Sequence, residues 1–381
     1  MKQNRNELGI LLGKDMKKKI GILTYHRSIN YGAFLQAYSL YNVIKKRYGD
    51  KWIVEIIDYE SEKAYKVYAK QFGKKGIYNK FKKNLNELKK TKTHIKSDSL
   101  DIVFKYIKMK NYDCVVVGSD EIWKIDGMRG FPNAYWLNGD IGDTVKVSYA
   151  ASSRNCYEKL TDFQRDYIRE SLSTFDYIGV RDISTKTMLS NITTKNINLN
   201  CDPVFLYDFG YDSTYRSRLI KKYKIDEQKK LMIVMIPDNR LVQLLSRYFD
   251  DMIIISLYDY NSFADFNLTD IDPFEWINVI SVANFMVTNR FHGVSFAMKY
   301  NVPFLALDNY DVIENSKIYD LLSRCNLEEH YCEYQGYQTD ENRKRIINRI
   351  DSMLLKNFDY SDDVLNLVSC SESFMNMFGE L

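Results

Sequence analysis

The sequence predicts an α/β protein with two domains, each built on a doubly wound parallel sheet. Three observations support this prediction. The chain has 381 residues, more than the roughly 250–300 at which a single core stops growing. Short apolar segments alternate with helix-compatible segments in two successive series. Polar side chains recur where the predicted strands end, and open parallel sheets bind their ligands at that edge.

We expect five segments in chain order: an N-terminal extension (1–16), a first domain (17–206), a connector with a basic helix (207–228), a second domain (229–325) and a C-terminal helical segment (326–381). The last part of the final segment, residues 362–378, is expected to cross back onto the first domain. Both domains are predicted to be Rossmann-like, with strands and helices in alternation.

The first domain begins with a strand–helix–strand unit. Its first helix is predicted from apolar residues on one face, including Leu35, Tyr38 and Ile44. Thr161 is a predicted helix N-cap, because its hydroxyl can accept a backbone N–H. The predicted strands are 20–24, 53–58, 114–117, 145–150 and 177–180. The predicted helices are 33–47, 100–109, 161–173 and 184–189, with a helical insertion over 61–97.

The second domain repeats the alternation. Its third strand leads into the sequence Asn289-Arg290-Phe291-His292-Gly293, after which a helix begins. Its predicted strands are 230–236, 252–257, 283–287 and 302–307. Its predicted helices are 238–249, 273–282 and 294–300.

Cysteine usage and hydropathy favour a cytoplasmic protein. The six cysteines form no Cys-x-x-Cys pair and have no histidines at metal-ligand spacing, so we expect reduced thiols and no metal site. There is no signal peptide, and no apolar run reaches the ~18 residues of a membrane-spanning helix. Neither a Gly-x-Gly-x-x-Gly nor a Walker-type loop is present, which argues against nicotinamide or nucleoside triphosphate chemistry.

Basic charge gathers in one stretch, the lysine block from Lys63 to Lys96. It holds twelve lysines and one acidic residue, Glu87. Such a block suits an anionic membrane face or a phosphorylated acceptor, with peripheral contact at the inner face of the membrane. A solvated helical surface explains it equally well. Nucleic acid is a weaker interpretation, because the block has no arginine and no recognisable binding motif accompanies it.

The strand-end loops predict one ligand site. In two facing domains they would line a single cleft. Arg290 and His292 are the strongest candidates, since a helix N-terminus favours an anion, arginine offers a fixed fork, and histidine exchanges protons near neutral pH. The alternative is a capping arginine beside a histidine satisfied in the core. The five loops are 24–32, 118–123, 151–154, 181–182 and 289–293.

Two other loops supply weaker candidates. Arg181 ends a strand just before a helix, as Arg290 does, and the two arginines together could hold a small dianion. The alternative is a salt bridge from Arg181 to Asp182 or to another surface carboxylate. Asp120 and Glu121 are adjacent, so on a strand their side chains face opposite ways and at most one enters the cleft.

With these motifs set out, the sequence resembles the polysaccharide pyruvyl transferase family over residues 18–310. Each motif is short, but their order and spacing are specific. They are TYH (24–26), NYGAFLQAY (30–38), VGSDEIW (117–123), SYAAS (148–152), VRD (180–182) and VTNRFHG (287–293).

The resemblance implies a GT-B-like pair of Rossmann-type domains. It also implies transfer of the pyruvyl group of phosphoenolpyruvate onto sugar hydroxyls as a ketal, with release of phosphate. The family's Arg-x-His falls on Arg290 and His292, and its other arginine on Arg181. Asn289 departs from the family, in which many members have an aspartate at this position.

The resemblance and the residue chemistry together suggest a role for each candidate site residue. His292 would remove a proton from the acceptor hydroxyl or protonate the leaving phosphate, and Asp120 or Glu121 would protonate the methylene carbon. Phosphoenolpyruvate would contact Arg290, Arg181, Asn289, Phe291 and Gly293. The expected acceptor or cleft residues are His26, Asn30, Tyr31, Gly32, Gln36, Ser119 and Ser152. No metal or cofactor is expected.

The sequence is also compatible with two other functions. One is a nucleotide-sugar-dependent glycosyltransferase of the same architecture, which would also need a basic residue near a helix N-terminus. The other is a non-catalytic membrane-surface partner of a polysaccharide assembly complex. The acceptor would be a sugar in a polysaccharide or in a lipid-diphosphate-linked precursor.

Overall fold

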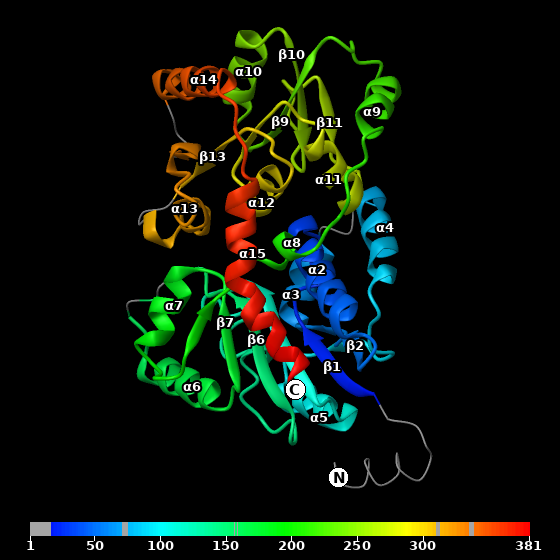
Figure 1. Cartoon of the computed structure of the whole chain (residues 1–381), viewed down its shortest axis with the longest axis vertical. Coiled ribbons are helices and arrows are strands. Elements are labelled where there is room, and N and C mark those ends of the chain that lie inside the picture. The colour runs from blue at the N-terminus through cyan, green and yellow to red at the C-terminus, as the bar shows by residue number, and fades with distance from the viewer. Residues whose placement is uncertain (1–16, 71–74, 156, 158, 310–312, 335–338) are drawn as a thin grey trace.

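Two six-stranded parallel sheets form the centres of two domains stacked along the long axis of the molecule (Figure 1). The computed structural model describes residues 17–70, 75–155, 157, 159–309, 313–334 and 339–381. The predicted N-terminal extension therefore lies outside the described residues. The α/β class and the parallel sheets are confirmed.

The first sheet has the strand order β2-β1-β5-β6-β7-β8, which changes direction between β1 and β5 as in doubly wound folds. Its central strand β5 is buried along its whole length, because helices cover both faces. The strands are β1 (Lys18–Leu23), β2 (Trp52–Ile56), β5 (Cys114–Asp120), β6 (Val145–Ala151), β7 (Tyr177–Val180) and β8 (Ile197–Leu199).

The helices of this domain begin at identifiable caps. Asn30 caps the first long helix, with its side chain accepting from Ala33 N at 3.3 Å. Thr161 forms a capping box with Gln164, which confirms it as an N-cap. The helices are α2 (Tyr31–Tyr48), α5 (Leu100–Lys110), α6 (Asp162–Ser173), α7 (Ile183–Ser190) and the short α8 (Pro203–Leu206).

The lysine block forms an insertion at the side of the first domain, next to α2 (Figure 1). It contains α3 (Glu62–Ala69), α4 (Lys75–Asn84) and η1 (Leu85–Glu87). The two-stranded sheet of β3 (Tyr59–Glu60) and β4 (Ile95–Lys96) closes the insertion. Phe81, Leu85 and Leu88 anchor it in the core. Lys63, Lys66, Lys70, Lys82, Lys83, Lys89, Lys92 and Lys96 are exposed.

The second sheet has the order β11-β10-β9-β12-β13-β14. Its last strand lies beyond residue 325, inside the stretch expected to be helical. Tyr331 pairs with Ala306 of the neighbouring strand. The strands are β9 (Lys230–Met235), β10 (Met252–Leu257), β11 (Phe266–Leu268), β12 (Phe285–Thr288), β13 (Phe304–Asp308) and β14 (Tyr331–Glu333). The helices are α9 (Tyr215–Tyr223), α10 (Asn239–Tyr248), α11 (Pro273–Ser281), α12 (Phe291–Lys299), α13 (Lys317–Ser323) and α14 (Asp340–Leu354).

The last helix, α15 (Ser361–Asn376), runs from the second domain down along the first (Figure 1). Arg47 and Glu372 form a two-pronged ion pair, with both N–O distances at 2.6 Å. Ser371 Oγ accepts from Cys201 N at 2.8 Å. The C-terminal helix therefore leaves the second domain and packs against the first domain.

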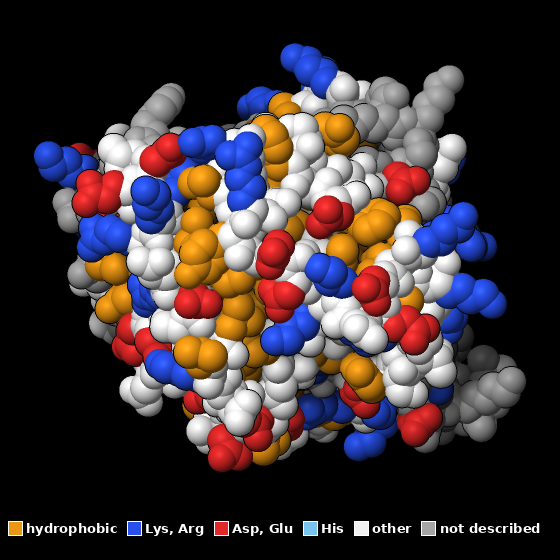
Figure 2. Space-filling model, turned by 90° about the horizontal axis from the view of Figure 1, so that it is seen from above, with side chains coloured by type: hydrophobic (Ala, Val, Ile, Leu, Met, Phe, Trp, Pro, Cys, Tyr) orange, Lys and Arg blue, Asp and Glu red, His pale blue; other side chains and the backbone are white. Residues whose placement is uncertain are grey.

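The surface seen from above the second domain carries basic and acidic side chains interspersed with apolar ones (Figure 2). The exposed lysines of the lysine block differ from this mixed surface, because they lie close together in the sequence with few acidic residues between them. Within the described residues, no helix is long and apolar enough to cross a bilayer.

Candidate active site

A cavity of about 600 Å³ lies between the domains, at the carboxyl ends of the strands of both sheets. This volume is within the range of small-molecule sites. The first domain contributes Asn30, Tyr31, Gly32, Glu121 and Arg154. The second contributes Met235, Ile236, Pro237, Tyr258, Trp276, Asn289, Arg290, Phe291, His292, Leu307, Asp308, Asn309, Lys317, Ile318 and Tyr334.

The loop between β12 and α12 presents the Arg-x-His sequence to this cavity. Thr288 Oγ1 accepts from Arg290 N at 3.0 Å, which fixes the turn before the helix. Gly293 lies behind it: a Cβ there would be 2.6 Å from Thr288 Oγ1, so this glycine serves close packing of helix on strand. Gly293 does not line the cavity, and direct contact with a ligand is not supported for it.

Three polar atoms of this loop are buried without a hydrogen-bond partner among the described residues. They are Asn289 Oδ1, Arg290 Nε and His292 Nε2, the last of which lies 3.4 Å from Asp202 Oδ2 but without hydrogen-bond geometry. Buried polar atoms of this kind are costly unless a partner arrives. All three residues line the cavity, so the loop has the character of a ligand-binding element.

The Arg290 guanidinium is held at the edge of the cavity. It lies 4.6 Å from the centre of the Tyr258 ring, and its Nη2 donates to Asp259 at 3.0 Å. Its side chain is 42% exposed, so solvent reaches it and this single ion pair holds it only weakly. Arg290 is therefore placed to exchange part of its contact with Asp259 for an anionic ligand.

His292 lies where the two domains meet. Its Nε2 is 3.4 Å from Asp202 Oδ2, at the start of α8 in the first domain. Its other ring nitrogen, Nδ1, packs over Gly32, where a Cβ would come within 2.1 Å. Only a glycine at the start of α2 leaves room for the ring, which gives Gly32 a steric role.

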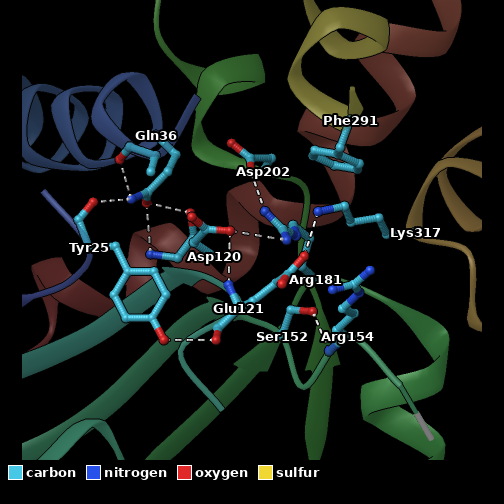
Figure 3. Close-up of polar contacts among 12 residues, drawn as sticks. Tyr25, Gln36, Asp120, Glu121, Ser152, Arg154, Arg181, Asp202, Phe291 and Lys317 are labelled. Atoms are coloured by element: carbon cyan, nitrogen blue, oxygen red, sulfur yellow. Dashed lines mark hydrogen bonds and ion pairs between the residues drawn. The ribbon is translucent and has the colours of Figure 1, made fainter. Parts of the chain in front are cut away.

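Arg181 is buried beneath the cavity and does not line it. Its Nη1 donates to Asp202 Oδ2 at 2.8 Å, and its Nη2 is 3.6 Å from Asp120 Oδ1 (Figure 3). The Phe291 ring lies 4.6 Å from the guanidinium carbon. Direct contact of Arg181 with a ligand would require this ring to move. The alternative partner, Asp182, caps α7 instead, with its Oδ1 accepting from Thr185 N.

Burial raises the pKa of the Asp202 carboxyl, but His292 and Arg181 outweigh burial and lower that pKa to about 2. Asp202 is therefore ionised at neutral pH. The Arg181 guanidinium of the same domain balances the charge of Asp202. The His292 imidazole of the second domain lies on its other side. Asp202 was not predicted as a site residue from the sequence, because it follows a short strand, β8, that has no apolar pattern.

Two further cationic side chains, Lys317 and Arg154, also line the cavity. Lys317, the first residue of α13, donates to Glu121 Oε1 at 2.5 Å (Figure 3). Arg154 lines the cavity beside them, in a backbone conformation with φ of 71°. Burial raises the pKa of Glu121, but Lys317, Arg154 and Arg181 together lower it to about 2. A carboxyl with this pKa is ionised at neutral pH, so Glu121 is unsuited to donating a proton.

Of the remaining predicted cleft residues, Asn30 and Tyr31 reach the cavity. Tyr31 OH donates to the carbonyl of Ile271 across the domain boundary. Ser152 Oγ accepts from Arg154 N at 2.9 Å and so shapes the loop that presents Arg154 (Figure 3). Asp120 is bonded to the backbone N–H of Glu121 and does not line the cavity.

Three predicted residues hold the loops from below and do not line the cavity. Gln36 accepts from Ser119 Oγ at 2.7 Å and donates to the carbonyl of Tyr25 at 3.1 Å. His26 lies 2.9 Å from Asp58 through Nε2, and Asp58 also accepts from Arg27. We infer supporting roles for these side chains.

The comparison of folds agrees with this architecture. The UDP-N-acetylglucosamine 2-epimerase of Methanocaldococcus jannaschii superposes with a TM-score of 0.54 at 12% identity, covering 96% of this chain and 100% of that one. A UDP co-structure of S. aureus MnaA gives 0.54 at 13%, covering 95% and 96%. A glycosyltransferase of Rickettsia africae gives 0.52 at 10%, covering 95% and 99%. The GT-B-like arrangement is thereby confirmed.

Sequence comparison identifies the family. No curated protein matches the chain. The family model for polysaccharide pyruvyl transferase matches residues 30–311. This range includes Arg154, Asp202, Arg290 and His292, and ends before Lys317. The chain belongs to the polysaccharide pyruvyl transferase family.

Proposed function

We propose that this protein transfers the pyruvyl group of phosphoenolpyruvate onto two hydroxyls of a sugar in a polysaccharide or a lipid-linked precursor, forming a ketal. The observation that carries the proposal is the cavity itself. Arg290, Lys317 and Arg154 face it from different elements, and His292 lies in its wall. Arginine and lysine side chains suit a small donor with a phosphate and a carboxylate.

The donor is proposed to lie against Arg290 and Lys317. Arg290 Nε has no hydrogen-bond partner among the described residues. The ion pair of Arg290 with Asp259 is partly exposed, so a ligand can replace it. Lys317 would share its charge between Glu121 and the ligand. Each cation stabilises the negative charge that the departing phosphate acquires. Arg181 supports this arrangement from beneath Phe291 through its electrostatic field.

The acceptor reaction is proposed to use His292 as its base. His292 takes the proton of the first hydroxyl and delivers it to C3 as the hydroxyl oxygen bonds to C2 of phosphoenolpyruvate, so that the electron pair of the double bond forms the new C–H bond and C3 becomes a methyl group. The C2–O bond to phosphate then breaks. The second hydroxyl adds to C2, and its proton leaves with the phosphate. Because Glu121 is ionised, we assign it to holding Lys317.

Aromatic side chains provide a surface for the sugar. Tyr258 and Trp276 line the second-domain side of the cavity, and Tyr31 packs edge-on against both rings, at 6.3 and 6.2 Å between centroids. Such rings cover the apolar faces of a sugar while its hydroxyls remain free to bond. The acceptor is therefore proposed to enter beside Tyr258, with its reacting hydroxyls toward His292.

The test is a ligand screen by thermal shift followed by a phosphate-release assay with candidate acceptors. Phosphoenolpyruvate is expected to raise the melting temperature. His292→Ala should keep that shift while losing phosphate release, because the imidazole moves the proton and does not hold the donor. Stabilisation by a nucleoside diphosphate but not by phosphoenolpyruvate would instead support the glycosyltransferase alternative. Undiminished release by His292→Ala would remove the histidine from the mechanism.

We also propose that the lysine block attracts an anionic partner, either a membrane surface or the diphosphate of a lipid-linked acceptor. Its exposed lysines include Lys63 and Lys66 in α3 and Lys70 at the C-cap of that helix. Each lysine close to an anionic surface contributes about 1 kcal/mol at most, and salt screens this contribution. Sedimentation with anionic and with neutral vesicles tests the proposal. Equal binding to both, or to neither, would contradict a membrane role.

A further inference from the structure

Asp202 connects the two charged residues that the family resemblance singles out. Its Oδ1 accepts from Val204 N at 3.1 Å, which fixes the carboxylate at the start of α8. Its Oδ2 accepts from Arg181 Nη1 at 2.8 Å and lies 3.4 Å from His292 Nε2. The side chain is 0% exposed, so water does not compete for either oxygen.

Given the function proposed above, we propose that Asp202 is a positioning residue that keeps a hydrogen on His292 Nε2 and leaves Nδ1 as the nitrogen that exchanges a proton with the substrate. The geometry differs at the two nitrogens. Nε2 lies 3.4 Å from a buried carboxylate oxygen, which can only accept, although the two atoms do not have hydrogen-bond geometry in this structure. Nδ1 packs against Gly32, which lines the cavity, and it is not one of the buried side-chain atoms that lack a hydrogen-bond partner. A carboxylate that orients the tautomer of a catalytic histidine in this way is worth several orders of magnitude in serine proteases.

Arg181 completes the arrangement. Its guanidinium balances the Asp202 charge from the other side, so the carboxylate stays ionised and acts as an acceptor. The imidazole comes from the second domain and the carboxylate from the first. The proton-transfer atom is therefore defined only when the domains are arranged as in this structure.

The primary test is the tautomer of His292 in the wild-type protein, measured by ¹⁵N NMR of histidine-labelled protein at neutral pH. The chain has four histidines, and His292→Ala assigns the signal by its loss. A hydrogen on Nε2 alone supports the proposal. A hydrogen on Nδ1, whether alone or together with one on Nε2, overturns it. This measurement needs no substrate, so it remains decisive even if pyruvyl transfer is never detected.

The second test is Asp202→Asn, which keeps the shape and can present an N–H to the imidazole. The hydrogen is expected to move to Nδ1. The kcat should fall by about 10²- to 10⁴-fold, while the KM for phosphoenolpyruvate changes much less. An unchanged tautomer with wild-type kcat overturns the proposal. If this variant does not fold, the wild-type tautomer alone decides.

The chain supplies a matched control in Asp58, which pairs with His26 at 2.9 Å and with Arg27 at 2.6 Å in the first domain. Asp58→Asn alters the same kind of aspartate–histidine–arginine cluster at residues that do not line the cavity. It should disturb the His26 signal and lower stability while leaving kcat within a few-fold of the wild type. An equal loss of kcat in both variants would show that Asp202 acts only through folding, and would overturn the positioning role.

Discussion

Gly32→Ala is the sharpest test of the site, because it perturbs His292 from the opposite domain. The added Cβ would lie 2.1 Å from His292 Nδ1 and 2.5 Å from Cγ, against 3.4 Å for an ordinary contact. The ring must therefore withdraw by about 1.3 Å, the difference between 3.4 and 2.1 Å. A displacement of about 1 Å in a reacting group can cost on the order of 10²-fold in rate.

The stability of the variant should change little. Gly32 is the second residue of α2 and has ordinary helical backbone, so alanine gains up to about 1 kcal/mol of helix propensity. That gain offsets part of the cost of moving the ring. We expect kcat for pyruvyl transfer to fall about 100-fold, with the free energy of unfolding within about 1 kcal/mol of the wild type, as measured by urea titration.

The control and the refutation are both available in this chain. At Gly127 a Cβ would meet nothing closer than 3.6 Å, so Gly127→Ala should leave kcat unchanged. In a His292→Ala background, Gly32→Ala should cause no further loss, because the ring with which it collides is absent. An equal loss in that background, or full activity of the single variant, would refute the reasoning.

Two further predictions follow from the domain boundary. Lys317→Met should raise the KM for phosphoenolpyruvate at least 10-fold, about 1.4 kcal/mol, measured by donor titration; an unchanged KM would remove Lys317 from the donor site. Burial raises the pKa of Asp320 from 3.8 to about 6, so the folded state binds this proton more tightly than the unfolded state. This residue therefore makes the protein less stable as pH rises from about 4 to 6, by up to about 3 kcal/mol. Asp320→Asn should reduce that loss in melting temperatures at pH 4.5 and 7, and an unaltered pH dependence would contradict it.

The central strands of both sheets were predictable from the sequence because they are continuous apolar runs bounded by polar loops. β5 and β12 are examples, each buried along its length. The edge strands β8, β11 and β14 were not predicted. Each has three residues and at least one polar side chain, as in Ile197-Asn198-Leu199, so neither length nor periodicity distinguishes them from loops.

Some residues of the site were likewise predictable from the sequence, and others were not. Arg290 and His292 were predictable because a strand end and a helix start lie next to each other in sequence. Lys317 follows a strand end at a greater distance along the chain, and only the tertiary structure brings it to Glu121. The same local signal placed Arg181 in the open cleft, but its strand tip is covered by Phe291 of the other domain. A local sequence pattern predicts which residues lie at the carboxyl edge of a sheet. It does not predict which side chains of the facing domain, such as Phe291, cover those residues.

The contacts between the domains explain why the site depends on both of them. Lys317 of the second domain pairs with Glu121 of the first, and His292 of the second faces Asp202 of the first. Asp320 accepts from Ile183 N across the same boundary at 2.8 Å. Separating the domains would leave the carboxylates of Glu121 and Asp202 without these partners, which is costly where water is scarce. An anionic donor that binds Lys317 would weaken the Lys317–Glu121 ion pair between the domains. We therefore expect donor binding to be coupled to domain movement.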